Sequence, residues 1–207
     1  MTDRSFAQSP LAALHIDGRV AEASANPGVR LQERRFPYLL NLRIAVGDQA
    51  IRQAVGQALG AALPHQANTT NEVGGAVVCW LGPDEWLIIA PHGSDSLAYQ
   101  LDAAIGGQHA ALTDISDARA VIRVSGRQAR EVLEKGCDLD LHTKSFAIGD
   151  CAQSGLAQAA VLLRRLADSA PDETTWEIYV ERSFGTYLWM WLEDAALEYE
   201  LAVEISD

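Results

Sequence analysis

The sequence predicts an α+β fold built from split βαβ units, the ferredoxin-like arrangement. Stretches with apolar residues at helical spacing alternate with pairs of short apolar runs, and Gly, Pro and Asp mark the boundaries. The predicted order is β-α-β-β-α-β-β-α, then a hairpin, a strand and a helix. With 207 residues, 48% of them hydrophobic, the chain is long enough to repeat or extend this plan once.

Residues 1–37 are predicted to form an extended N-terminal arm. Chain breakers crowd this segment: Asp17-Gly18, Asn26-Pro27-Gly28 and Phe36-Pro37. The arm is either a disordered tail or a segment that becomes ordered across a partner. In the second case its apolar anchors are Leu11, Leu14, Ile16, Phe36 and Tyr38. Residues 38–207 form the α+β region, either as one body or as subdomains at about 38–140 and 141–207.

The first half of this region contains two helices and four strands. Residues 41–46 alternate polar and apolar side chains, which is typical of a strand with one buried face. Apolar residues of 51–63 share one helical face, and Pro64 ends that helix. After a polar loop at 65–75 we expect strands at 76–81 and 86–90, a helix at 94–105 and a short strand at 110–115.

The second half continues with a β-branched strand at 119–124 and a short helix that Gly136 ends. After irregular residues 137–149 we expect strands at 150–157, 160–167 and 176–180.

The last helix is predicted over residues 183–199. Its main apolar stripe comprises Phe184, Tyr187, Leu188, Trp191, Leu192 and Ala195. At 100° per residue, Trp189, Met190 and Leu197 fall on the other side. A helix that is apolar on both sides is either buried all round or covered by another chain. We favour a partner, because 207 residues make a small core for complete internal burial.

The net charge of −12 argues against a nucleic-acid or membrane-surface binder, since both need basic surfaces. Residues 168–207 hold eleven acids and one base, Arg182. They form either a solvated acidic face or a surface for a basic partner. Three cysteines do not suggest a disulfide framework, and no signal-like or membrane-spanning segment is evident. We expect a cytoplasmic protein.

No motif for catalysis, cofactor binding or metal binding stands out. Gly74-Gly75 and Gly106-Gly107 lack the spacing of a phosphate loop, and the five histidines are scattered. Ser116 and Ser125 lack a nucleophile elbow. We therefore assign no catalytic, cofactor-binding or metal residue.

Several segments resemble a known family when read together. Residues 114–126 (Asp-Ile-Ser-Asp-Ala-Arg-Ala-Val-Ile-Arg-Val-Ser-Gly) look like a signature of the aminomethyltransferase-like folate-binding fold, and residues 81–87 are similar to its preceding hairpin. The closer resemblance is to the gamma subunits of heterotetrameric sarcosine oxidase. It rests on Lys-Gly-Cys-Asp-Leu-Asp-Leu-His at 135–142, Arg-Ser-Phe at 182–184, Tyr-Leu-Trp at 187–189 and Ser-Pro-Leu at 9–11.

This resemblance implies the split βαβ units of the N-terminal part of the folate-binding fold. It also implies a non-catalytic subunit, with a role in assembly and stability, beside alpha, beta and delta subunits. Such a complex oxidatively demethylates sarcosine to glycine, forming hydrogen peroxide and, with tetrahydrofolate, 5,10-methylenetetrahydrofolate. FAD, FMN and tetrahydrofolate would bind the other subunits.

We expect the partner interface to use Leu11, Leu14, Phe36, Trp189, Met190 and Leu197. One alternative is a stand-alone tetrahydrofolate-binding protein or one-carbon transferase of the same fold. Another is an unrelated α+β domain.

Overall fold

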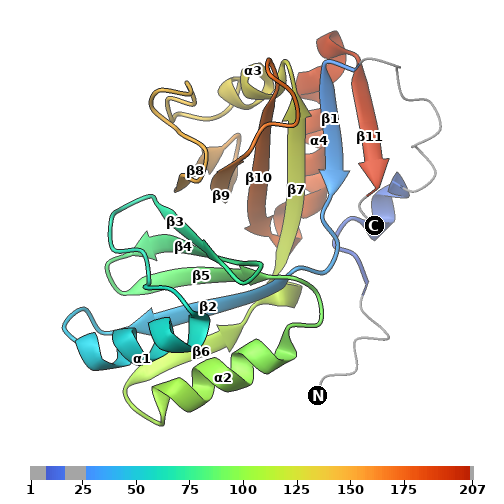
Figure 1. Ribbon diagram of the computed structural model, residues 1–207. Coiled ribbons are helices and arrows are strands. Elements are labelled where there is room, and N and C mark those ends of the chain that lie inside the picture. Colours follow the sequence, from blue (N-terminus) through green and yellow to red (C-terminus); the bar gives the residue numbers. More distant parts are fainter. Residues whose placement is uncertain (1–7, 17–26, 206–207) are drawn as a thin grey trace. The chain divides into compact units, whose positions relative to one another are not determined.

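The computed structural model describes residues 8–16 and 27–205 (Figure 1). The chain forms two compact units. The first unit combines Met1–Arg35, Ala118–Ser145 and Ser154–Asp207, and the second combines Phe36–Asp117 and Phe146–Gln153. These units differ from the consecutive subdomains expected at about 38–140 and 141–207, because the chain leaves the first unit after residue 35 and returns to it at residue 118.

The second unit is a split βαβ fold, as predicted. Its antiparallel sheet has the order β3-β4-β5-β2-β6, which is the ferredoxin-like order with β3 added at one edge. Helices α1 and α2 pack against each other and cover one face of this sheet (Figure 1). The elements are β2 (Tyr38–Ile44), α1 (Gln49–Leu59), β3 (Thr70–Val73), β4 (Ala76–Gly82), β5 (Glu85–Ala90), α2 (Asp95–Ile105) and β6 (Ala110–Asp114).

Local sequence explains this unit well. Leu40, Leu42 and Ile44 alternate along β2 and pack in one cluster with helix residues such as Ile51 and Leu101. At the start of α1, the Asp48 carboxylate accepts a hydrogen bond from the Ile51 amide at 3.2 Å. Gly60 ends the helix in the left-handed conformation, at φ 84°.

The first unit repeats the plan with two additions. Its sheet has the order β11-β1-β7-β10-β9-β8. Strands β7, β9, β10 and β11 keep the ferredoxin-like order, while β1 is inserted between β11 and β7, and β8 extends the far edge. Helices α3 and α4 contact each other and pack on strands β10 and β7 respectively. The elements are β1 (Val29–Glu33), β7 (Arg119–Gly126), α3 (Ala129–Glu134), β8 (Cys151–Leu156), β9 (Ala159–Leu166), β10 (Thr174–Glu181), α4 (Gly185–Ala196) and β11 (Leu201–Ile205).

The predicted arm is wrong over residues 29–33. These residues form the inner strand β1, which pairs in parallel with β11 and antiparallel with β7. Val29 and Leu31 are completely buried. The strand starts where Gly28 passes close to Gly126, and a Cβ added at Gly126 would lie 2.3 Å from the Gly28 carbonyl oxygen. Residues 1–7 and 17–26 of the predicted arm lie outside the described ranges.

Candidate functional site

The 114–126 segment that carries the family resemblance serves as a structural turn and strand. The Ser116 amide and hydroxyl both donate to Asp114 Oδ1, at 2.9 and 2.5 Å. The Ser116 hydroxyl oxygen in turn accepts from the Leu39 amide at 3.0 Å. These hydrogen bonds hold the turn after β6 in place, so the side chains of Asp114 and Ser116 have a structural role.

The Lys-Gly-Cys segment is structural in the same way. Lys135 Nζ donates to the Ala195 carbonyl at 2.6 Å, pairs with Glu198 and lies over the Tyr199 ring. The hydrogen bond to Glu198 raises the pKa of Lys135, against the smaller opposing effect of desolvation. A cation at the end of a helix is favourable, so Lys135 secures the end of α4.

The orientation of α4 differs from the prediction. Its buried side is made by Gly185, Leu188, Trp189, Leu192, Ala195 and Ala196. Trp189 is 0% exposed, so its placement on an open face was wrong. The physical reason lies at Gly185, where an added Cβ would lie 2.9 Å from Ala120 Cβ, because the helix begins directly against β7.

Leu11 is also internal rather than available to a partner. It is 1% exposed, and its Cδ2 lies 3.2 Å from the Cβ position of Gly185. Leu14 and Phe36 are half-buried, and the Phe36 ring lies edge-on to His92 at 6.4 Å. Of the six residues expected at a partner interface, only Met190 (56%) and Leu197 (73%) are largely exposed.

These two residues belong to an exposed apolar strip that we call the α4 outer strip. It comprises Phe184, Tyr187, Met190 and Leu197. Phe184 and Tyr187 were expected to face inward, but they are exposed and stack edge to face at 6.3 Å. Several exposed apolar residues along one helical segment are typical of protein–protein contact surfaces.

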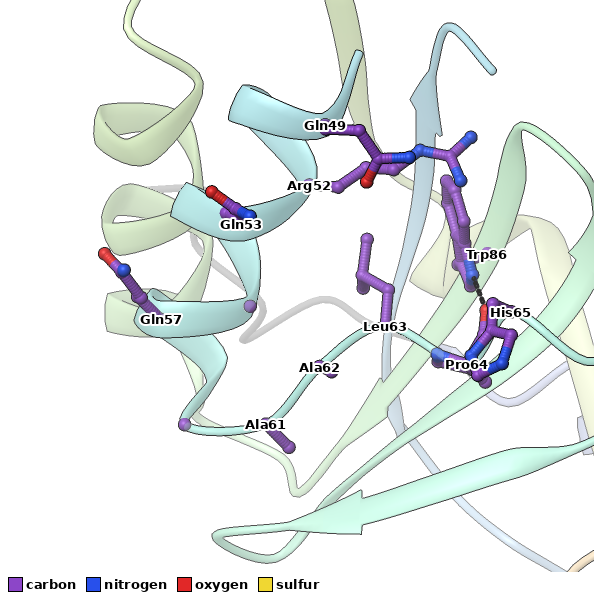
Figure 2. Close-up of a pocket in the computed structure, with 12 residues that line it drawn as sticks. Gln49, Arg52, Gln53, Gln57, Ala61, Ala62, Leu63, Pro64, His65 and Trp86 are labelled. Atoms are coloured by element: carbon purple, nitrogen blue, oxygen red, sulfur yellow. Dashed lines mark hydrogen bonds between the residues drawn. The ribbon is translucent and has the colours of Figure 1, made fainter. Parts of the chain in front are cut away.

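A hollow of about 710 Å³ lies in the second unit, between α1, the turn after it and Trp86. We call it the α1 groove (Figure 2). Its walls are formed by Gln49, Arg52, Gln53, Gly56, Gln57, Gly60, Ala61, Ala62, Leu63, Pro64, His65 and Trp86. The Trp86 indole nitrogen donates to the Pro64 carbonyl at 2.8 Å, which fixes the ring at the back of the groove.

Arg52 is held rigidly at the edge of this groove. Its guanidinium carbon lies 5.0 Å from the centre of the Trp86 ring, and Nη2 donates to the Pro83 carbonyl at 2.8 Å. The groove therefore offers side-chain amides, one oriented cation, the His65 imidazole and apolar surface, and its lining contains no carboxylate. Such a set binds polar or anionic groups, and among the lining residues His65 has no hydroxyl, thiol or carboxylate partner with which to form a catalytic pair.

Sequence reasoning missed the α1 groove. The available signal was Gln at i, i+4 and i+8 on a helix without a single acidic residue, inside a strongly acidic chain. Apolar periodicity predicts the buried face of α1 and does not by itself predict a groove along the polar face.

Buried charge in the first unit gathers around Glu177 on β10. This carboxylate is completely buried and accepts from Arg34 and Arg123 at 3.0 and 2.8 Å, and from the Tyr179 hydroxyl at 2.6 Å. Arg164 lies 3.4 Å away. Desolvation alone would raise the pKa of Glu177, but the two arginines and Tyr179 outweigh it and hold the pKa below its usual range.

A metal centre has no support in the parts of the chain that the structure describes. No three His, Cys, Asp or Glu side chains gather there as a ligand set would require. Within the same ranges, no helix is both long and apolar enough to span a membrane.

The fold places this chain in a known structural class. The glycine cleavage system aminomethyltransferase T from Bartonella henselae superposes with a TM-score of 0.69 at 15% identity, over 95% of this chain and 58% of that one. At that identity the likeness establishes the fold alone, which is the aminomethyltransferase-like α+β fold predicted from the sequence.

Sequence comparisons then identify the family. Residues 43–198 match the model of the "Sarcosine oxidase, gamma subunit family". Sarcosine oxidase subunit gamma from an Arthrobacter species is 37% identical, and that from Corynebacterium sp. strain P-1 is 36% identical, each over 94% of this chain and 92% of the relative. This chain belongs to the sarcosine oxidase gamma subunit family.

A solved complex agrees with this assignment. A chain of the heterotetrameric sarcosine oxidase from Corynebacterium sp. U-96, in complex with pyrrole 2-carboxylate, superposes with a TM-score of 0.84 at 33% identity. The match covers 97% of this chain and all of that one.

Proposed function

We propose that this chain is the gamma subunit of a heterotetrameric sarcosine oxidase, with alpha, beta and delta subunits as its partners. The proposed complex is cytoplasmic, oxidises sarcosine to glycine with formation of hydrogen peroxide, and forms 5,10-methylenetetrahydrofolate when tetrahydrofolate is present. FAD, FMN and tetrahydrofolate are assigned to the other subunits. The role of this chain is to assemble and stabilise the complex.

The observation that carries this proposal is the end-to-end match to a chain of a heterotetrameric sarcosine oxidase, with a TM-score of 0.84 over 97% of this chain. The nature of the surfaces supports it. The α4 outer strip exposes Met190 and Leu197 to solvent, and the α1 groove has no acid–base pair. A subunit that contributes contacts rather than chemistry needs surfaces of this kind.

Co-expression with the proposed alpha, beta and delta subunits tests the proposal. We expect the chain to co-purify in a complex of four different subunits that produces hydrogen peroxide from sarcosine. Omitting this chain should lower the yield of assembled complex, and the chain alone should be inactive. Failure to co-purify, together with micromolar tetrahydrofolate binding by the isolated chain, would instead support the stand-alone folate protein.

A further inference from the structure

We propose that the α1 groove binds an extended segment of a partner subunit, anchored by a carboxylate on Arg52. This inference rests on the proposed subunit role and deepens it, because it assigns a second contact surface and the chemistry of its occupant. The groove lies wholly within the second unit, whereas the α4 outer strip belongs to the first.

Arg52 is the first step of the argument. Within the described residues it forms no ion pair, although Arg30, Arg43 and Arg119 all pair with carboxylates. Its Nε is shielded from solvent and has no hydrogen-bond partner there. An arginine fixed by Trp86 and Pro83, in a chain of net charge −12, is pre-organised for an incoming anion.

The surroundings of Arg52 leave room for a negative charge. Helix α1 contains no acidic residue. The nearby Asp48 carboxylate is engaged with the Ile51 amide at the start of the helix. Two acids flank Arg52 without pairing with it: Asp48 precedes the helix, and Asp84 follows Pro83, whose carbonyl Arg52 contacts. A carboxylate that approaches Arg52 along the groove meets the side-chain amides of the lining, which contains no acid.

Three glutamines indicate that the anion belongs to a polypeptide. Gln49, Gln53 and Gln57 project from successive turns of α1 (Figure 2). The helical rise places neighbouring glutamines about 6 Å apart. Groups facing the same way in an extended chain recur every two residues, at about 6.7 Å. Each side-chain amide both donates and accepts, so the three glutamines match alternate residues of an extended segment about five residues long.

A free small carboxylic acid would use only part of this surface. It would engage Arg52 and Gln49 and leave Gln53 and Gln57 without a role. The base of the groove consists of Gly56, Gly60, Leu63 and Trp86, which offers shallow space for an apolar side chain of the same segment. The occupant is therefore an extended stretch that carries Asp or Glu next to an apolar residue.

The test compares two arginine variants in the whole complex. Arg52→Gln removes the anchor, whereas Arg43→Gln removes a surface arginine of the same unit that already pairs with Glu85. Affinity for the remaining subunits is measured by calorimetry at two salt concentrations. We expect Arg52→Gln to weaken assembly about tenfold or more and to reduce its salt dependence, because a charge-assisted bond is lost. Arg43→Gln should change the affinity less than about threefold.

A second pair of variants keeps the result decisive if Arg52→Gln fails to fold. Gln53 is exposed, so Gln53→Glu and Gln53→Lys should both fold with the wild-type melting temperature. Gln53→Glu should weaken assembly by repelling the carboxylate, and Gln53→Lys should not. In a separate sample, a photo-reactive benzoylphenylalanine at position 53 should cross-link to an acidic peptide of a partner subunit.

The possible failures are distinguishable. If the wild-type chain does not co-purify with the oxidase subunits, the subunit role itself is wrong and this inference falls with it. If the complex assembles but Arg52→Gln and Gln53→Glu bind as the wild type does, only the groove proposal is overturned. Cross-linking of a partner subunit at position 197 but not at position 53 would likewise overturn only the groove proposal.

Discussion

Glu177 is one carboxylate surrounded by three arginines, and this imbalance determines the effect of its removal. In Glu177→Gln, Arg34, Arg123 and Arg164 would lose the buried charge that compensates them. We expect the free energy of unfolding to fall by about 3–5 kcal/mol at pH 7, as for a broken buried ion pair. Urea unfolding followed by fluorescence measures it.

The lowered pKa of Glu177 also predicts a pH dependence. A carboxylate with a depressed folded-state pKa stabilises the fold above its unfolded pKa, about 4.3, and loses that contribution as pH falls through the folded value. The difference in free energy of unfolding between the wild type and Glu177→Gln should therefore become smaller below about pH 4. Glu181→Gln is the control, because Glu181 lies on the same strand but forms a largely exposed ion pair with Arg119. We expect this variant to change the free energy of unfolding by less than about 1 kcal/mol at every pH.

Gly136 supports the packing of α4. A Cβ at this position would lie 2.6 Å from Trp191 Cζ2 and 3.1 Å from the Ala157 amide nitrogen. Gly136→Ala should lower the free energy of unfolding by about 1–3 kcal/mol, because the indole ring must move. In Gly155→Ala, where the added methyl group meets nothing within 4 Å, denaturant unfolding should show a change of less than about 0.5 kcal/mol.

At the scale of elements, the inner position of β1 has a direct consequence for stability. Because β1 is an inner strand and Leu31 is completely buried, Leu31→Ala should lower the free energy of unfolding by about 2–5 kcal/mol. Leu197→Ala is the matched control, because the same atoms are removed from a 73% exposed position. A near-zero effect of Leu31→Ala in thermal unfolding would show that residues 29–33 form a loosely attached arm.

Elements with a full amphipathic signal could be predicted from the sequence. The predicted helix at 94–105 matches α2, and strands at 150–157 and 160–167 match β8 and β9. Three short strands, β1, β3 and β11, could not. Their alternation is brief, and β3 has only half-buried or exposed side chains. Strand β11 depends on pairing with β1, and β1 depends on pairing with β7 and β11, all of them distant in the sequence.

The orientation of α4 also could not be predicted from apolar periodicity. Apolar residues surround this helix, so periodicity alone predicted the wrong side for Trp189, Phe184 and Tyr187. What decides the orientation is the close contact of Gly185 with Ala120 and Leu11, which depends on tertiary structure. Exposure of Met190 and Leu197 was predicted correctly, whereas their role at an interface remains a prediction.

For the whole molecule, the α4 outer strip provides a test of assembly that is separate from stability. We expect the double variant Met190→Ser with Leu197→Asp to bind the other subunits at least about tenfold more weakly, because apolar anchors of an interface are replaced by polar groups. Its melting temperature should match the wild type, as both side chains are exposed. Sedimentation of mixed subunits measures the change.

Val46→Asp is the control for the added negative charge. Val46 is exposed like Met190 and Leu197, at 61%, but it lies in the second unit, away from the α4 outer strip. This variant should assemble normally. Equal weakening by both changes would mean that extra negative charge, rather than the strip, reduces binding.

The parallel pairing of β1 with β11 has a consequence for synthesis on the ribosome. Leu31 is synthesised before every other strand of its sheet, whereas its neighbour Val203 is synthesised after all of them. The sheet of the first unit therefore stays incomplete, with β1 lacking one neighbour, while the five strands of the second unit can already pair. Nascent chains should accordingly expose the hydrogen-bonding edge of β1 until β11 has left the ribosome.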